Sequence, residues 1–126
     1  MPSISKQNAP VGVDAPPIEI RAAELAEYTV GFETHRLDTD ATPLFVGLPD
    51  DRCQCTHLGY VTKGKLTFHY ADHDETYSAG EAYVATPGHT PEIYAGGEVV
   101  EFTLTEDLAK TAVVVEANMA AMAGGA

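Results

Sequence analysis

Between residues 28 and 104, turn-forming residues divide the chain into short runs of β-forming character, at intervals of roughly eight to twelve residues. Proline, glycine and aspartate favour turns because they preset or tolerate the backbone angles that turns require. Many short strands with such connections are typical of an antiparallel sandwich or barrel, so an all-β fold is expected here. The separators are Leu48-Pro49-Asp50-Asp51, Lys63-Gly64, Ala71-Asp72-His73-Asp74, Ala79-Gly80, Pro87-Gly88 and Gly96-Gly97.

The runs alternate in polarity, which is the pattern of strands with one buried face. Residues 28, 30 and 32 are apolar and would share one face, whereas residues 29, 31 and 33 would share the other. The expected strands are 18–20, 28–33, 44–46, 53–61, 65–71, 75–78, 82–85, 92–94 and 99–104, and residues 22–26 are expected to form a single helical turn.

The period changes after residue 104, where an amphipathic helix and tail are expected over residues 106–126. Thr105 is suited to the N-cap, and Glu106 and Asp107 complement the helix dipole in the first turn. The apolar stripe of this helix must cover either the β-domain or a second subunit. Its members are Leu108, Ala112, Val115, Met119 and Met122.

Residues 1–17 are rich in proline and show no periodicity, so they are expected to form a flexible arm or a strand-like extension that orders only on packing. This segment lacks the charged flank and apolar core of a signal peptide or membrane span. By length, the remaining chain forms one barrel domain over residues 18–105, followed by the helix.

The chain carries nineteen acidic and seven basic residues, which gives a formal net charge of −12. Such a charge repels nucleic acid and anionic membranes, so neither is expected as a partner. The two cysteines lie at positions 53 and 55, where strand geometry sets their Cα atoms about 6.6 Å apart, too wide for a relaxed disulfide. Free thiols indicate a reducing compartment, and we expect a cytoplasmic protein.

Four side chains of metal-binding type are concentrated in two short segments. Alternate residues of a strand share a face, so Cys53, Cys55 and His57 would all project in the same direction. His89 follows about thirty residues later, in the segment Thr86-Pro87-Gly88-His89. Two thiols and two imidazoles suit Zn²⁺ best among the common biological metals. The alternative is that these residues are buried thiols and hydrogen-bonded histidines without a metal.

The same residues resemble the first motif of the cupin family, a group of small β-barrels with a metal-lined mouth. That motif runs from a glycine through His-x-His and a glutamate to a second glycine. Here Gly47 precedes Cys53 and Cys55, which stand at the two histidine positions, and counting back from Gly64 places His57 at the glutamate position.

The second cupin motif is also present in altered form, with Gly80 followed by Pro87-Gly88, and with His89 two residues ahead of the usual histidine position, which Pro91 occupies. The resemblance covers roughly residues 44–104. It implies a cupin-type antiparallel β-barrel (a double-stranded β-helix or jelly roll) with one C-terminal α-helix, and it implies a homodimer. The thiols shift the expected metal from the iron or nickel of related sites toward zinc.

The number of ligands separates two functions, because four protein ligands close a zinc site whereas three leave a position for water or substrate. The first is a metal-dependent enzyme that acts on a small polar organic molecule by Lewis-acid or acid–base chemistry, with Glu92 and Tyr60 as candidate catalytic residues. The second is a non-catalytic module that binds or senses a small molecule, with a structural metal or none. His35, His69 and His73 are expected to be surface or structural residues.

Overall fold

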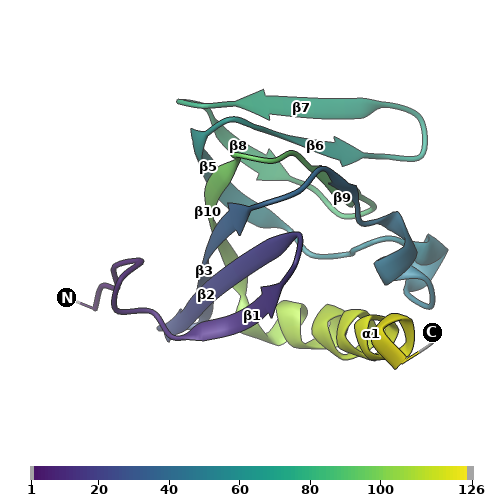
Figure 1. Ribbon diagram of the computed structural model, residues 1–126, viewed down its shortest axis with the longest axis horizontal. Coiled ribbons are helices and arrows are strands. Elements are labelled where there is room, and N and C mark those ends of the chain that lie inside the picture. Colours follow the sequence, from purple (N-terminus) through teal and green to yellow (C-terminus); the bar gives the residue numbers. More distant parts are fainter. Residues whose placement is uncertain (1, 125–126) are drawn as a thin grey trace.

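The computed structural model describes residues 2–124 and contains two antiparallel sheets with a single α-helix after the last strand (Figure 1). The expected all-β fold with one C-terminal helix is therefore confirmed. The strands are β1 (Val11–Ala15), β2 (Ile18–Leu25), β3 (Tyr28–His35), β4 (Thr39–Asp40), β5 (His57–Lys63), β6 (Lys65–His69), β7 (Asp74–Ser78), β8 (Ala82–Ala85), β9 (Thr90–Ile93) and β10 (Glu98–Leu104), joined by the 3-10 turns η1 (Thr42–Phe45) and η2 (Pro49–Asp51) and followed by α1 (Thr105–Gly124).

The six-stranded sheet has the order β1-β2-β3-β10-β5-β8 and the four-stranded sheet has the order β4-β9-β6-β7. One passage from the six-stranded sheet to the four-stranded sheet lies between β5 and β6, at Gly64. This residue has φ +67°, and a Cβ atom on it would lie 3.0 Å from Cα of Gly97. Both the backbone angle and the close approach require glycine, so the corner between the sheets depends on this position.

Three local expectations are wrong. Residues 22–25 belong to β2 and form no helical turn, because β2 pairs along its length with β3 and the ladder overrides the helix propensity of alanine. Residues 44 and 45 lie in the 3-10 turn η1 instead of a strand, and β5 begins only at His57. In the proline-rich start, Val11–Ala15 pair with β2, so of the two expected forms this part takes the strand-like extension and not the flexible arm.

The core lies between the two sheets and draws residues from both of them. Burial of these apolar side chains is the main favourable term for folding, at roughly 1.5–3 kcal/mol for each large side chain. The cluster consists of Val61, Leu66, Phe68, Tyr83, Ala85, Ile93 and Val99.

The six-stranded sheet is polar on part of its inner face and apolar on part of its outer face. Directly paired residues share a face, and Glu33 pairs with Val99, a core residue, so Glu33 points into the barrel. By the same alternation Glu101 also points inward, whereas Phe102 is 39% exposed on the outside. In β3, therefore, Glu33 and His35 face the interior, whereas Phe32 lies on the opposite face.

Helix α1 packs against η1 and covers the segment that carries the two cysteines. Val115 contacts a small cluster made of Phe45, Cys53 and Cys55, and the Asn118 side chain donates hydrogen bonds to backbone carbonyls of the η1 region. The central part of the apolar stripe thus covers the helix's own domain, as Figure 1 shows for α1 along the lower edge of the barrel. Within residues 2–124, no helix is long and apolar enough to cross a membrane.

Candidate metal centre

A backbone bridge joins the two segments that carry the candidate ligands. The Cys53 amide donates to the carbonyl of His89 over 2.8 Å, and the Gly88 amide donates to the carbonyl of Cys53 over 2.8 Å. The two motifs are therefore neighbours in the fold although the sequence separates them. This backbone bridge fixes the relative positions of the Cα atoms from which the side chains of Cys53 and His89 project.

Three of the four candidate side chains converge. One ligand atom from each of Cys53, His57 and His89 lies within 4.8 Å of the other two. The Cys53 Sγ to His57 Nε2 distance is 3.8 Å, and the two imidazole centroids are 5.0 Å apart. The residues are 2%, 8% and 1% exposed, with Phe68 against both rings. The group is thus a buried cluster of one sulfur and two nitrogen donors.

The Nδ1 atoms of both imidazoles already form hydrogen bonds, which leaves the Nε2 atoms free to bind a metal ion. His89 Nδ1 donates to the Thr86 carbonyl over 2.6 Å, and His57 Nδ1 bonds Thr103 Oγ1 over 2.7 Å. His89 Nε2 is buried and has no hydrogen-bond partner. Burial lowers the pKa of His89 to about 4, so the ring is neutral at physiological pH, as metal ligation requires.

These three residues fit a divalent metal ion on the chemistry of their donor atoms. A hydrogen bond to the ring nitrogen that does not bind the metal is the usual way in which a protein orients a ligating histidine. An unpartnered buried nitrogen otherwise leaves a desolvated polar atom without compensation. A thiolate with two imidazoles is a donor set suited to zinc, and three protein ligands leave one tetrahedral position free.

Cys55 does not join this group. It is 1% exposed, but its Sγ lies 3.4 Å from Thr111 Oγ1 on α1. Residues 54–56 form no regular strand, so the expected row of three side chains on one face is broken. A hydrogen bond from the Cys53 thiol raises the pKa of Cys53 and lowers the pKa of Cys55 to about 7. Cys55 is therefore the thiol of this buried pair that loses its proton more easily.

The two expected catalytic residues lie elsewhere. Tyr60 is 43% exposed on the outer face of the six-stranded sheet. Glu92 is on the outer face of the four-stranded sheet, because its neighbour Ile93 points into the core. Each lies three residues after a candidate ligand, and an odd separation turns a strand side chain to the opposite face. The proposed proton-transfer roles of Tyr60 and Glu92 at this site are therefore wrong.

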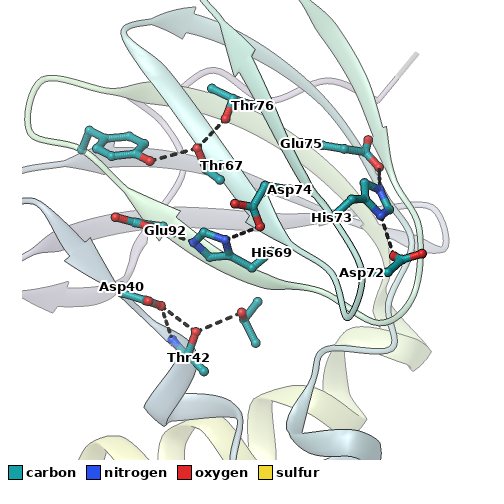
Figure 2. Close-up of polar contacts among 12 residues, drawn as sticks. Asp40, Thr42, Thr67, His69, Asp72, His73, Asp74, Glu75, Thr76 and Glu92 are labelled. Atoms are coloured by element: carbon teal, nitrogen blue, oxygen red, sulfur yellow. Dashed lines mark hydrogen bonds and ion pairs between the residues drawn. The ribbon is translucent and has the colours of Figure 1, made fainter.

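Glu92 belongs to a second polar group, shown in Figure 2. Ligand-type atoms of Asp40, His69 and Glu92 lie within 4.8 Å of one another. His69 bonds Asp74 through Nδ1 and Glu92 through Nε2, both over 2.7 Å, and these bonds raise the pKa of His69. The three side chains form an ion-pair network, in which the His69 ring lies between two carboxylates and links β6 to β7 and β9. His69 is therefore structural, as expected.

The interior also contains polar residues that motif reasoning did not identify. Glu33 on β3 and Glu101 on β10 are half-buried on the inner face and are accompanied by His35 and Tyr83. The only signal in the sequence was alternation, since Val99, Glu101 and Thr103 share one face of the last strand. Without knowing which face was inside, that signal could not be used.

Two of the surface hollows lie away from the candidate ligands. One of about 620 Å³ is lined by residues that include Lys6, Arg21 and Arg36, and one of about 260 Å³ lies on the apolar outer face of β5, β8 and β10. The metal group itself is covered by α1 and η1 at the end of the barrel.

The arrangement of strands matches solved structures of cupins. An RmlC-like cupin from Shewanella frigidimarina superposes with a TM-score of 0.56 and 11% identity, over 83% of this chain and 93% of that chain. KdgF from Halomonas sp. superposes with a TM-score of 0.55 and 18% identity, over 79% and 90%. The chain spans 61% of the EutQ protein from Clostridium difficile, at a TM-score of 0.49 and 12% identity over 69% of this chain. No protein-family model and no curated protein matches the sequence. The fold is that of a small cupin.

Proposed function

We propose that this cupin binds one divalent metal ion through Cys53, His57 and His89, and that the ion is zinc. The observation that carries the proposal is the buried Nε2 atom of His89, which has no partner although its ring is held in place through Nδ1. When bound, the ion would supply Lewis-acid chemistry at a substrate oxygen. The mixed sulfur and nitrogen donors favour zinc over iron or nickel.

The ligand of such a centre is a small polar organic molecule held inside the barrel. The inner faces of β3 and β10 present carboxyl, hydroxyl and imidazole groups, which are suited to hydrogen bonding with a polar compound. An open fourth position at the metal would receive one oxygen of that compound. Acid–base chemistry on this molecule is the activity that we propose.

A non-catalytic role in ligand binding or sensing is the second candidate, and the covering of the site favours it. The three ligand residues are at most 8% exposed, and Thr111 of α1 lies 3.8 Å from Cys53 Sγ. A metal enclosed in this way would serve stability if a fourth ligand closed the site.

Metal content distinguishes the three-ligand site from its alternatives. Protein purified without a metal-affinity tag should contain about one zinc ion per chain by mass spectrometry of the elements. Cys53→Ala and His89→Ala should lose it, whereas Cys55→Ala should retain it because Cys55 lies outside the group. His69→Ala serves as the control for loss of an unrelated histidine. Equal loss in Cys55→Ala would reject the three-ligand site.

Cobalt substitution distinguishes an open site from a saturated one. Azide added to the Co²⁺ form should change the visible absorption spectrum if a coordination position is free. An unchanged spectrum at saturating azide would favour the structural role. The same titration in Cys55→Ala shows whether that thiol limits access to the ion.

We also propose that the protein is a cytoplasmic homodimer. Both cysteines are free thiols, which suits a reducing compartment. A second copy would cover the outer face of β5, β8 and β10, where large apolar side chains are 39% to 55% exposed around the hollow of about 260 Å³. These side chains are Leu58, Tyr60, Val84 and Phe102.

A further inference from the structure

Two carboxyl side chains face each other inside the barrel. Glu33 of β3 pairs with Val99 of β10, and Gly31 pairs with Glu101, so the two glutamates are diagonal neighbours on the inner face. A hydrogen bond between the two carboxyl groups acts on both acidities, because it lowers the pKa of Glu33 and raises the pKa of Glu101. Two carboxyl groups in contact do not both ionise readily, so such a pair keeps one proton that the two groups share.

Each carboxyl group has a donor of its own. Tyr83 donates its hydroxyl proton to Glu101 Oε1 over 2.7 Å. His35 Nε2 lies 3.0 Å from Glu33 Oε1, and because His35 Nδ1 is buried without a partner, the ring proton belongs on Nε2. The pair is thus held at both ends by hydrogen-bond donors, Tyr83 at Glu101 and His35 at Glu33.

The surroundings of the two carboxyl groups shift their pKa values in opposite directions. Burial raises the pKa of Glu101 to about 7, and the charge of Glu33 adds to that rise. Burial acts in the same direction on Glu33, but the hydrogen bond and charge of His35, with the hydrogen bond of Glu101, lower the pKa of Glu33. The titratable groups that face the pair are His35 on β3, His57 on β5 and Tyr83 on β8.

The pair is accessible and close to the candidate metal centre. The Glu33 side chain keeps 18% of its surface exposed, more than any of the three ligands. Thr103 binds the His57 ring and lies two residues after Glu101 on the same face of β10, which places it about 6.6 Å further along the strand. One small molecule can therefore contact both groups.

We propose that Glu33 and Glu101 share one proton and act as the acid–base group toward an uncharged hydroxy-carbonyl compound bound beside Cys53, His57 and His89. This proposal rests on the proposed metal centre. The compound should be uncharged because two carboxyl groups share the inner face beside it, and the lowered pKa of Glu33 keeps one of them ionised. An anionic substrate would meet a carboxylate without compensation.

The step needs no oxidant. A proton leaves the carbon next to the carbonyl and passes to Glu101 while Glu33 keeps its hydrogen bonds. The electron pair of the broken C–H bond forms the C=C bond of an enediol, and the carbonyl oxygen takes up the proton that the carboxyl pair had shared. The adjacent hydroxyl group then returns its proton to the pair as its oxygen becomes the new carbonyl, and the proton on Glu101 passes to the former carbonyl carbon, which interconverts ketose and aldose. A base whose pKa lies near the working pH suits both directions.

The shared proton is tested by carbon NMR of glutamate carboxyl groups in the zinc-loaded full chain. One interior carboxyl should titrate near about 7, and Glu33→Gln should lower that midpoint by about one pH unit because the like charge is gone. Glu98→Gln is the control on the same strand, since Glu98 binds Lys6 and Lys63 at the surface. If all carboxyls of the wild-type protein titrate near their ordinary value, the shared proton is refuted.

The acid–base role is tested with dihydroxyacetone in D₂O, followed by proton NMR. Zinc-loaded protein should exchange the carbon-bound protons for deuterium, and Glu101→Gln should be slower by about 100-fold or more, whereas Glu98→Gln should match the wild type. Zinc binding without any exchange above the protein-free rate would overturn this role and leave the metal centre standing. Absence of zinc binding would instead reject the proposed function.

Discussion

A methyl group at position 59 tests how tightly the barrel interior is packed around Tyr83. Gly59 lies on the inner face of β5, directly opposite Tyr83 of β8. A Cβ atom there would lie 2.6 Å from Cε2 of the Tyr83 ring and closer still to Cζ. The ring cannot yield easily, because it stacks on Tyr77 at 4.7 Å and its hydroxyl group binds Glu101.

The cost of Gly59→Ala can be worked out from these contacts. Overpacking of a closed interior costs about 1–3 kcal/mol. Displacement of the ring also breaks the bond from Tyr83 to the Glu101 carboxyl, which is worth about 1.5–3 kcal/mol when the acceptor is charged. Because the two terms arise from one movement, we expect a loss of about 3 kcal/mol in the free energy of unfolding.

Urea denaturation followed by circular dichroism measures this loss. Gly31→Ala is the matched control, because a Cβ atom at position 31 would make only an ordinary contact of 3.8 Å with Ile20. The control should stay within about 1 kcal/mol of the wild type. If Gly59→Ala also unfolds within about 0.5 kcal/mol of the wild type, the reasoning about the Tyr83 contact is incorrect.

Three further outcomes are expected. Leu66→Ala should reduce the free energy of unfolding by about 2–5 kcal/mol in urea titration, because Leu66 is fully buried; a loss below 1 kcal/mol would contradict this. The hydrogen bond to Asp74, with a second carboxylate, raises the pKa of His69 above its ordinary 6.5, so its stabilisation is complete below that value and is lost as pH rises through the raised pKa. His69→Gln should therefore cost up to about 1 kcal/mol near pH 5.5 and less at alkaline pH, and a cost that grows with pH would refute this. Phe102→Glu should convert the proposed homodimer to a monomer in light scattering, whereas Val113→Glu on the exposed side of α1 should not; an unchanged mass for Phe102→Glu would reject this interface.

Turn residues predicted most of the architecture because they act locally. Gly64 and the other separators define where strands end, and this suffices for an antiparallel barrel whose neighbouring strands are short. Residues 22–25 were assigned wrongly because their state depends on pairing with β3, which no local pattern reveals. Tertiary pairing overrides local propensity in such segments.

The candidate site was predicted in part for the same reason. The structure brings Cys53 and His57 together although no regular strand joins them, and the bridge to His89 explains why a displaced histidine still reaches them. Alternation predicted the same side for Cys55, but its segment is irregular and its thiol turns toward α1. That deviation depends on the position of a helix that lies about fifty residues further along the chain.

The interior carboxyl pair could not be predicted from the sequence. Glu33 and Glu101 become neighbours only through the pairing of β3 with β10, two strands far apart in the chain. The apolar residues of β3 also suggested the wrong inner face. Hydrophobic residues are usually buried, whereas some of those in β3 face outward. Polar residues inside and apolar residues outside are the opposite of what alternation alone suggests.

The order of elements along the chain has a consequence for metal uptake. All three candidate ligands precede α1, so the ligand residues leave the ribosome before the helix that covers them. An ion arriving at that stage meets an accessible cluster, whereas one leaving later must wait until α1 detaches. Exchange of the ion in the mature protein would then be governed by the opening rate of a helix and not by the strength of its bonds to sulfur and nitrogen.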